Sequence, residues 1–516
     1  MQQLDTVNNS IKTIAKGSYF VFLGVMINLF LGFIIRIILV RFTTQEEFGM
    51  YSIAITITGI FTTISTLGLG EGSTRYIAYF RGKDEKQNVQ DTIFSSIIIG
   101  LVSSILLMGI SFSSSGIIAT RIFNSPEISL ILKATSITIP FIVLIDIGVA
   151  IFRGFEKAKV SVYINNILKN VTYSFLLTTV VFLKLSFSEM VYAYVISIII
   201  TGIIAAVYFI KKPPLKMKWD KIRINYITRE LLLNSIPLLG VSILLLIMSW
   251  TDTLMLGYFK TPEVVGSYNT AYPIAHLLSI VLSSISFLYV PIIAQLYSKN
   301  QIKELKLISG TYTKWCFMLT LPIFFVIFMF PDFTLNLFFG QRYTGVSETL
   351  QILAFGCLLD SYFGFNYYTL LCAGKSRLLV NCSMISAGLN ILLNFILIPP
   401  YGTVGAAIAS VSSFALIEIY MTIRLNRLFK VHPFTKSYIK ITFISGILLY
   451  IFYAYKDSFV LSIWTVLIYM FLFLFIYAIL LLFSRSLDQT DIRMIKTIEK
   501  RIGINHSELE GLASRE

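Results

Sequence analysis

The chain has 516 residues, of which 56% are hydrophobic and only 13% are charged, and its mean hydropathy is +0.78. A soluble protein of this length carries far more charged surface, so the composition excludes a soluble enzyme or binding domain and indicates a membrane protein. The net charge of +15 does not indicate nucleic-acid binding, because the basic residues lie in short loops between long apolar segments and form no continuous basic face.

About fourteen apolar segments reach the length of roughly 20 residues that a membrane-spanning helix needs. In the first half they run over residues 17–40, 48–69, 92–113, 128–152, 160–183 and 189–210. In the second half they run over 231–258, 264–294, 310–331, 348–373, 377–398 and 402–425, followed by 437–455 and 459–484. The first sixteen residues are polar and have no signal-peptide cleavage pattern, so we expect the first segment to be retained. The sequence predicts an all-α polytopic membrane protein.

A motif of five residues occurs twice at a constant offset of 217 residues. Phe42, Thr44, Glu46, Gly49 and Tyr51 recur in the same order as Phe259, Thr261, Glu263, Gly266 and Tyr268. An apolar segment of helix length precedes each copy, and another follows it. Internal repeats of this kind are typical of secondary transporters, which build a binding site between two related halves. With six helices in each half, both halves begin in the same direction, and the repeat is expected to be parallel.

The repeat divides the chain into five predicted regions. They are an N-terminal six-helix bundle at 1–210, a basic cytoplasmic linker at 211–230, a C-terminal six-helix bundle at 231–426, two extra transmembrane helices at 427–484 and an amphipathic tail at 485–516. Four isoleucines share one helical face of the tail, so it either lies on the membrane surface or forms a solvated helix.

Lysine and arginine are concentrated in alternate loops, and this distribution predicts the orientation. The basic loops include 75–86, 153–159, 211–223, 299–306 and 424–436. The opposite loops have little beyond Arg41, Arg121, Lys184, Lys260, Arg342 and Lys456. By the positive-inside rule the first set is cytoplasmic, and an even number of spans leaves both termini there as well. The expected location is the plasma membrane.

The residue pattern does not favour catalysis. We find no carboxylate pair, no His/Cys cluster and no Walker A sequence, so a membrane glycosyltransferase, polymerase or ligase and an ATPase are all disfavoured. The four cysteines lie within or beside apolar segments and have no metal-ligand spacing, which is typical of buried packing residues. We therefore expect no enzymatic activity, no bound metal and no cofactor.

Several short motifs, taken in order, resemble the polysaccharide-transport branch of the multidrug/oligosaccharidyl-lipid/polysaccharide exporter superfamily, the Wzx-type flippases. They are Gly68-Leu69-Gly70-Glu71-Gly72 with Arg75, Asp252 to Phe259 running into Glu263 and Gly266, Leu337-Phe338-Phe339-Gly340 with Tyr343, and Asn390 to Asn394 leading into Ile398-Pro399-Pro400-Tyr401-Gly402 and Gly405-Ala406-Ala407. The resemblance covers essentially the whole chain. It implies two pseudo-symmetric six-helix bundles that form a V around a central cavity, with two additional C-terminal helices.

The same resemblance implies a flippase that works by alternating access. Its substrate would be a polyprenyl-phosphate-linked oligosaccharide or polysaccharide repeat unit, moved from the cytoplasmic to the outer leaflet, with Na⁺ or H⁺ as the candidate coupling ion. A two-bundle chain needs no partner to form a cavity, so a monomer is expected. Two alternatives stay open. An aromatic cavity poor in cations would favour a cation-coupled multidrug exporter, and a cavity closed to both sides would favour a non-transporting assembly factor for envelope polysaccharide.

The predicted span 160–183 carries the main candidates for binding an anionic head group. Asn165, Asn166, Lys169 and Asn170 lie within adjacent turns of one helix face, and Lys169 is near the middle of the span. A sugar phosphate does not cross hydrocarbon unaided, so its path needs polar walls and a cation at depth. We expect this face to line the cavity. The alternative is a buried structural pair between Lys169 and a carboxylate.

Four other residues are weaker candidates for substrate binding. Arg36 lies near the outer end of the first span and either lines the cavity or anchors the helix at the interface. Arg75 and Arg153 lie at cytoplasmic helix ends, where they either meet the diphosphate or follow the positive-inside rule. Asn390 belongs to a polar stripe on the span 377–398, for which helix–helix hydrogen bonding is the alternative.

Carboxylates inside the spans are the candidates for ion coupling. Asp146, Asp252 and Asp360 either bind the H⁺ or Na⁺ that drives the cycle or neutralise a nearby Lys or Arg. Glu418 is a further acidic residue at this depth.

Overall fold

The computed structural model describes residues 23–215, 226–432, 434–455, 462–483 and 491. These ranges form helices and turns and contain no β-strand, which confirms the all-α prediction. By length and apolar composition, ten helices in these ranges are able to cross a membrane, or eleven if the bent pair α5 (Ile128–Ser136) and α6 (Ile139–Gly154) counts as one span. The predicted total of about fourteen is larger because the predicted spans 160–183 and 348–373 are broken into shorter helices, and because the predicted spans 377–398 and 402–425 are counted together as α17 (Ser376–Phe429).

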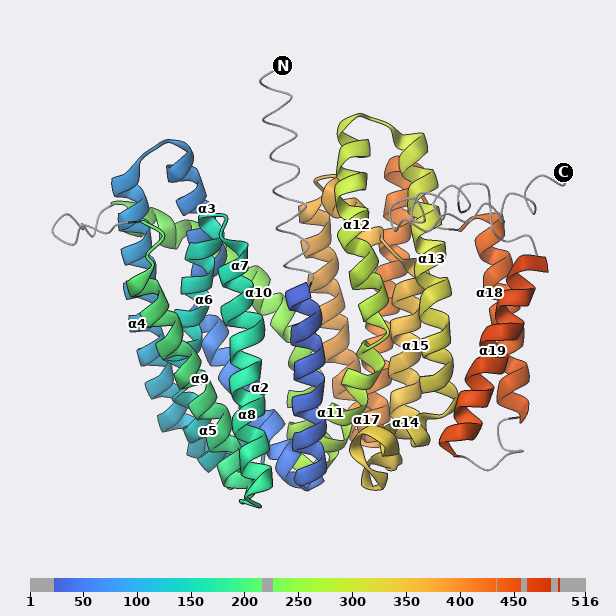
Figure 1. Cartoon of the computed structure of the whole chain (residues 1–516), viewed down its shortest axis with the longest axis horizontal. Helices are drawn as coiled ribbons and strands as arrows, with labels where there is room; N and C mark the ends of the chain where they lie inside the picture. Colours follow the sequence, from blue (N-terminus) through green and yellow to red (C-terminus); the bar gives the residue numbers. More distant parts are fainter. Residues whose placement is uncertain (1–22, 216–225, 433, 456–461, 484–490, 492–516) are drawn as a thin grey trace. The chain divides into compact units, whose positions relative to one another are not determined.

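The first half of the described chain consists of one unlabelled helix followed by α2 to α9 (Figure 1). Their bounds are Leu23–Phe42, α2 Gln45–Ser65, α3 Leu69–Gly82, α4 Lys86–Ile117, α5 Ile128–Ser136, α6 Ile139–Gly154, α7 Ala158–Ser161, α8 Lys169–Phe182 and α9 Phe187–Lys211. Two stretches are π-helical, η1 Ile118–Ile122 and η2 Val162–Leu168. The predicted span 160–183 is therefore a composite of α7, η2 and α8.

The second half contains α10 to α19. Their bounds are α10 Tyr226–Phe259, α11 Pro262–His276, α12 Ser279–Ser298, α13 Ile302–Met329, α14 Pro331–Phe339, the 3₁₀ helix η4 Gln341–Val346, α15 Ser347–Phe363, α16 Asn366–Cys372, α17 Ser376–Phe429, α18 Lys436–Tyr455 and α19 Ile463–Phe483. The predicted span 264–294 is divided between α11 and α12, and 348–373 between α15 and α16. Residues 1–22, half of the predicted linker (216–225) and, apart from residue 491, the predicted tail lie outside the described residues.

By internal contacts the chain forms two compact units. The first contains the described residues up to Pro273 together with Leu335–Leu353 and Val380–Phe414. The second contains Ile274–Thr334, Ala354–Leu379 and the described residues from Ala415 onwards. The domain boundaries expected from the repeat stay predictions.

The core of the first unit is built from aliphatic faces. α3 and α4 pack against α6, and α10 packs against α2, α3 and α4. Ile93, Val143, Ile147 and Leu231 are fully or almost fully buried in one cluster there. Apolar side chains on the outer surfaces of these helices are exposed in large numbers, as expected for helices that face lipid rather than water.

In the second unit, α12 packs on α13 and α16, while α18 and α19 pack on α13. Phe325 of α13 stacks on Phe473 of α19 with ring centroids 4.0 Å apart. The two extra C-terminal helices are thus joined to the unit through aromatic packing.

Each copy of the repeated motif begins a helix. Thr44 caps α2, because its side-chain oxygen accepts a hydrogen bond from the Glu47 amide while the Glu47 carboxylate accepts one from the Thr44 amide. Thr261 immediately precedes α11, and Pro262 occupies the first helical position. The starts of α2 and α11 pack together at Gly49 and Gly266.

Candidate functional site

A buried carboxylate with a full set of polar partners lies in the first unit. Asp252 of α10 accepts hydrogen bonds from the Tyr268 hydroxyl at 2.5 Å, the Asn394 amide at 2.7 Å and the Ser410 hydroxyl at 2.6 Å. The Asn390 amide lies 3.5 Å from the same carboxylate and donates to Ser410 at 2.9 Å. All of these side chains except Ser410 are buried. Removing a carboxylate from water is costly, and these donors offset that cost.

The polar partners meet because α17 is broken. Gly402 has φ 55° and ψ −125°, a backbone conformation that glycine adopts readily, and two prolines precede it. After the break the backbone packs tightly against the segment before it, since a Cβ on Gly405 would lie 2.2 Å from the carbonyl oxygen of Leu397. The motif from Ile398 to Gly405 therefore makes a tight hairpin. It places Asn394, before the break, and Ser410, after it, on the same carboxylate.

The oxygen atoms of this cluster suit a small hard cation or a proton. Besides the two carboxylate oxygens, the Asn390 side-chain oxygen accepts from the Asn394 amide at 3.1 Å. The Asn394 side-chain oxygen is buried and has no hydrogen-bond partner among the described residues. Carboxylate, amide and hydroxyl oxygens are the ligands that hard cations prefer. The arrangement is chemically able to hold an ion that replaces one of the donated hydrogen bonds.

The two copies of the repeat differ at this place. The offset of 217 residues aligns Tyr268 with Tyr51 but aligns Asp252 with Ile35. In the first copy the Tyr51 hydroxyl is 3.1 Å from the hydroxyl of Tyr173 on α8, in a buried aromatic cluster. The acidic cluster is therefore a property of the second copy only.

Arg36 links the first helix to the helix that carries Tyr268. Its guanidinium donates to the carbonyl oxygen of Asn269 at 3.3 Å. The Asn269 amide in turn lies 3.3 Å from the hydroxyl of Thr253, the neighbour of Asp252. Arg36 is half-buried, and its contact is with protein backbone at the edge of the Asp252 cluster.

A second polar region surrounds Lys169 at the start of α8. The π-helical stretch η2 ends immediately before it, and π-helical turns are frequent at functional sites. The Asn170 amide donates to the side chain of Asn28 on the first helix at 2.7 Å. Lys169 interacts electrostatically with the carboxyl group of Asp146 on α6, although no ion pair within 4.0 Å joins them in the described chain.

All four polar residues predicted on this face are half-buried, namely Asn165, Asn166, Lys169 and Asn170. They share the region with Asn28 and Asp146, which gives amides, one cation and one carboxylate on neighbouring helices. Both readings made from the sequence, a cavity lining and a buried charge pair, therefore concern the same three helices.

The remaining basic candidates lie elsewhere. Arg153 at the end of α6 pairs with Glu71 at 3.1 Å, and both side chains are largely exposed. Arg75 is exposed on α3. Just before it, a Cβ on Gly72 would lie 2.1 Å from the Ser235 hydroxyl oxygen, so the glycines of that motif permit close packing of α3 on α10.

Asp360 belongs to the second unit. It is half-buried on α15, and its charge acts on the buried Glu418 of α17. The Asn366 amide donates to Glu418 at 3.3 Å and to Thr422 at 2.8 Å. Asp360 thus lies in a group of its own and is not part of the Asp252 cluster.

Sequence reasoning did not select Tyr268, Ser410 or Asn28 as site residues. Tyr268 was visible as the last residue of the repeated motif, and Asn28 as a lone amide in an apolar helix. Ser410 had no distinctive signal, since serine is frequent in this chain.

The sequence matches known families. The profile described as polysaccharide biosynthesis protein matches residues 14–297, and the MatE profile matches residues 237–396. A probable low-salt glycan biosynthesis flippase of Haloferax volcanii is 32% identical over 168 residues, which are 33% of this chain and 36% of that protein. A putative O-antigen transporter of Shigella flexneri is 24% identical over 380 residues, 72% of this chain and 88% of that protein. The Haloferax match thus spans little more than a third of that relative's length.

Solved structures with the same fold include a lipid II flippase MurJ in an inward closed conformation, with a TM-score of 0.73, 17% identity, and coverage of 90% of this chain and 98% of that chain. An inward-facing multidrug resistance MATE transporter has a TM-score of 0.62 at 15% identity, covering 77% and 95%. These likenesses confirm the transporter fold expected from the repeat.

Proposed function

This chain belongs to the polysaccharide biosynthesis protein family, and we propose that it is a flippase that moves a lipid-linked oligosaccharide or polysaccharide repeat unit across the membrane by alternating access. The observation that carries the proposal is the pair of polar sites in an otherwise apolar chain. One contains a half-buried Lys169 among amides, and the other contains the buried Asp252 cluster. The names of the flippase and transporter relatives support the substrate class.

Lys169 and its amide neighbours are proposed to contact the phosphate and sugar of the substrate. A head group of this kind carries negative charge and many hydroxyl groups, which a cation and several amides bind well. Asn165, Asn166 and Asn170 provide donors and acceptors on one face, and Asn28 adds another from the first helix. Arg75 and Arg153 stay proposed contacts for the diphosphate at the helix ends.

Asp252 is proposed to bind the coupling ion, H⁺ or Na⁺. Occupation of the carboxylate by an ion competes with the hydrogen bond from Tyr268, which lies two residues beyond Gly266. Because Gly266 packs against the start of α2, a movement of Tyr268 is proposed to alter the packing between the two motif copies. Asp146 and Asp360, the other carboxylates predicted for coupling, keep the alternative role of balancing nearby charge.

We propose that the protein lies in the plasma membrane with both termini in the cytoplasm, and the distribution of Lys and Arg supports this orientation. In that orientation the substrate enters from the inner leaflet and leaves into the outer one. A single chain contains both copies of the repeat, so we propose that it works as a monomer.

Reconstitution tests the proposal. Liposomes with the purified protein and a fluorescent polyprenyl-diphosphate-linked disaccharide should expose the labelled sugar to an external enzyme faster than protein-free liposomes do, and Lys169→Gln should remove most of the difference. Equal exposure with and without the protein would contradict the flippase. Acceleration of dye efflux in the same liposomes, without glycan flipping, would instead support a cation-coupled multidrug exporter.

A further inference from the structure

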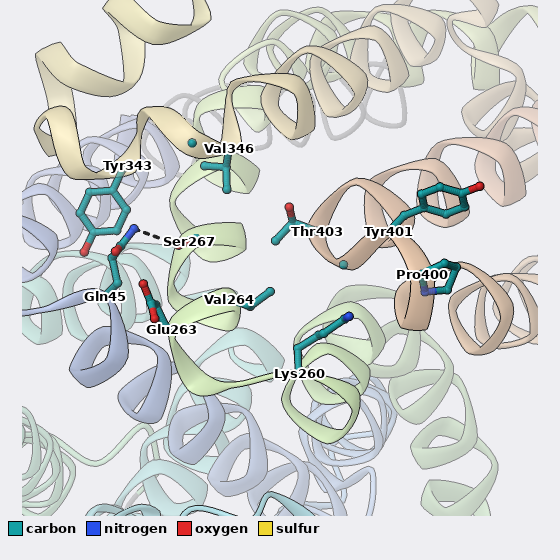
Figure 2. A pocket seen from close by; sticks show the side chains of 12 residues that line it. Gln45, Lys260, Glu263, Val264, Ser267, Tyr343, Val346, Pro400, Tyr401 and Thr403 are labelled. Carbon is teal, nitrogen blue, oxygen red and sulfur yellow. Dashed lines mark hydrogen bonds between the residues drawn. The ribbon is translucent and has the colours of Figure 1, made fainter.

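A pocket of about 520 Å³ lies within the first unit and shares no lining residue with either polar site. Its walls come from four segments that are distant in sequence: the start of α2, the start of α11, η4 and the hairpin of α17. Figure 2 shows the side chains of Val264 and Thr403 pointing into the space from different walls. Cavities of this volume are in the range that holds a small organic ligand.

The pocket is lined by apolar and aromatic side chains together with hydrogen-bonding groups. Val264, Val346, Pro400, Tyr343 and Tyr401 form most of the apolar part. Gln45 adds an amide whose two protons are donated within the protein, and Thr403 adds a hydroxyl. Glu263 lines the pocket with an exposed carboxylate, which forms no ion pair within the described chain and is able to accept hydrogen bonds from a ligand. Donors and acceptors on an apolar base are typical of sites for polar, uncharged molecules.

The charges of the pocket argue against a phosphate and against a lipid tail. One lysine, Lys260, and one glutamate, Glu263, line it, so their charges cancel. The Lys260 ammonium also donates to the carbonyl oxygen of Pro399 at 2.8 Å, which leaves it only two further protons for a ligand. A phosphate site would need more cations, and an acyl chain would need a wall without charges.

The pocket walls are fixed by contacts inside the unit. The Gln45 amide donates to Ser267 at 3.1 Å and to the carbonyl oxygen of Arg342 at 2.9 Å. The Thr403 and Thr349 hydroxyls are 2.8 Å apart. These bonds join α2 to α11 and η4, and they join α17 to the start of α15, so the pocket is preformed and a ligand loses little affinity in ordering it.

We propose that this pocket binds one or two sugar residues of the glycan after it has crossed the membrane. The inference rests on the proposed flippase function, because the loops that form the pocket belong to the set poor in Lys and Arg, which the positive-inside rule places outside. Neutral hydroxylated rings match the balanced donors and acceptors, and the volume suits a mono- or disaccharide. The translocated head group would bind there, beside the contact between the two motif copies.

Saturation-transfer NMR on the purified full chain tests the site, with glucose, galactose, N-acetylglucosamine and N-acetylgalactosamine as probes and inorganic pyrophosphate as the anionic comparison. At least one sugar should receive saturation from the wild-type protein, and pyrophosphate should not compete with it. Gly345→Trp should abolish the transfer, since a Cβ at Gly345 meets open space on the pocket wall. The matched control is Gly446→Trp on α18, where a Cβ also meets open space, far from the pocket in sequence.

Glu263→Gln gives a second measurement that does not depend on the bulky variant. Loss of a charged acceptor should weaken sugar binding about tenfold. Transfer that is equal in the wild type, Gly345→Trp and Glu263→Gln, or absent for all four sugars, would overturn the pocket assignment. Competition by pyrophosphate would show an anion site instead, and would also overturn it.

The flipping assay on the same preparations separates the two proposals. Sugar binding that is sensitive to Gly345→Trp, in a protein that does not flip the labelled lipid, would reject the flippase and keep the pocket. Flipping without such binding would keep the flippase and reject the pocket.

Discussion

Gly49 and Gly266, which occupy the same position in the two motif copies, lie against each other's helix start. A Cβ on Gly49 would lie 1.7 Å from the carbonyl oxygen of Pro262, and a Cβ on Gly266 would lie 2.1 Å from the carbonyl oxygen of Gln45. Because both obstacles are backbone atoms, neither yields by a change of rotamer. The repeated glycine is therefore explained by a reciprocal close contact between α2 and α11.

Gly49→Ala and Gly266→Ala should each destabilise this packing by about 1–3 kcal/mol, the usual cost of overpacking a tight contact. The two effects should be less than additive, since either one separates the same pair of helices. Thermal unfolding of the purified protein measures the change. Gly240→Ala is the control, because nothing lies within 4 Å of a Cβ there. Melting temperatures equal to that of the control would contradict the contact.

Asp252→Asn should uncouple transport from the ion gradient. The amide keeps the size of the side chain but removes the negative charge that would attract a cation or take up a proton. Glycan flipping in liposomes should lose its response to an imposed Na⁺ or pH gradient, while the flipping rate without a gradient stays measurable. Asn390→Asp, which adds a carboxylate beside Asp252, is expected to raise the ion affinity. A gradient response unchanged in Asp252→Asn would reject the coupling role.

Lys169→Arg should keep partial flipping, and Lys169→Gln should lose most of it with near-normal expression. The cation is needed for an anionic head group, whereas the amide only preserves packing. Flipping in a complementation or leaflet-accessibility assay gives the readout. If Lys169→Gln instead fails to accumulate, and Asp146→Asn restores its level, a structural charge balance between Lys169 and Asp146 would be the better explanation.

Lys314 and Asp491 form a buried ion pair within the second unit. The Lys314 ammonium donates to Asp491, the Trp315 indole donates to the same carboxylate at 2.8 Å, and both charged side chains are almost fully buried. Asp491→Asn should lower stability by about 3–5 kcal/mol, because it removes the negative charge that accepts a hydrogen bond from a buried ammonium.

The pair Lys314→Met with Asp491→Leu should recover most of that loss, since two apolar side chains remove both charges together. Thermal unfolding of the three variants decides the point. A double variant as unstable as Asp491→Asn would show that the region depends on the polar contacts themselves and not on charge balance.

Much of the fold was predictable because lipid imposes simple rules on a sequence. Each helix must hide its backbone polar groups, so long apolar segments marked the helices, and the offset of 217 residues marked the repeat. The breaks inside the predicted spans were harder to foresee. At 160–183 the chain turns π-helical without a proline or glycine, and an apolar stretch has no signal that separates one span from two short helices.

The candidate site was predictable only in part. Lys169, Asp252 and Asn390 stood out because a charge or an amide in an apolar helix is costly and needs a reason. Their partners did not stand out, since hydroxyl groups such as that of Ser410 are tolerated anywhere in a helix by bonding back to the chain.

The sequence by itself determined the membrane class, the helical fold, the internal repeat and the family, because these depend on composition and on order along the chain. Only the tertiary structure decided which polar residues act together. The break at Gly402 brings Asn394 and Ser410 to Asp252, and the reciprocal contact of Gly49 with Gly266 joins the two motif copies. Such groupings depend on distances between helices that are far apart in sequence, and those distances are set by packing, which no local pattern records.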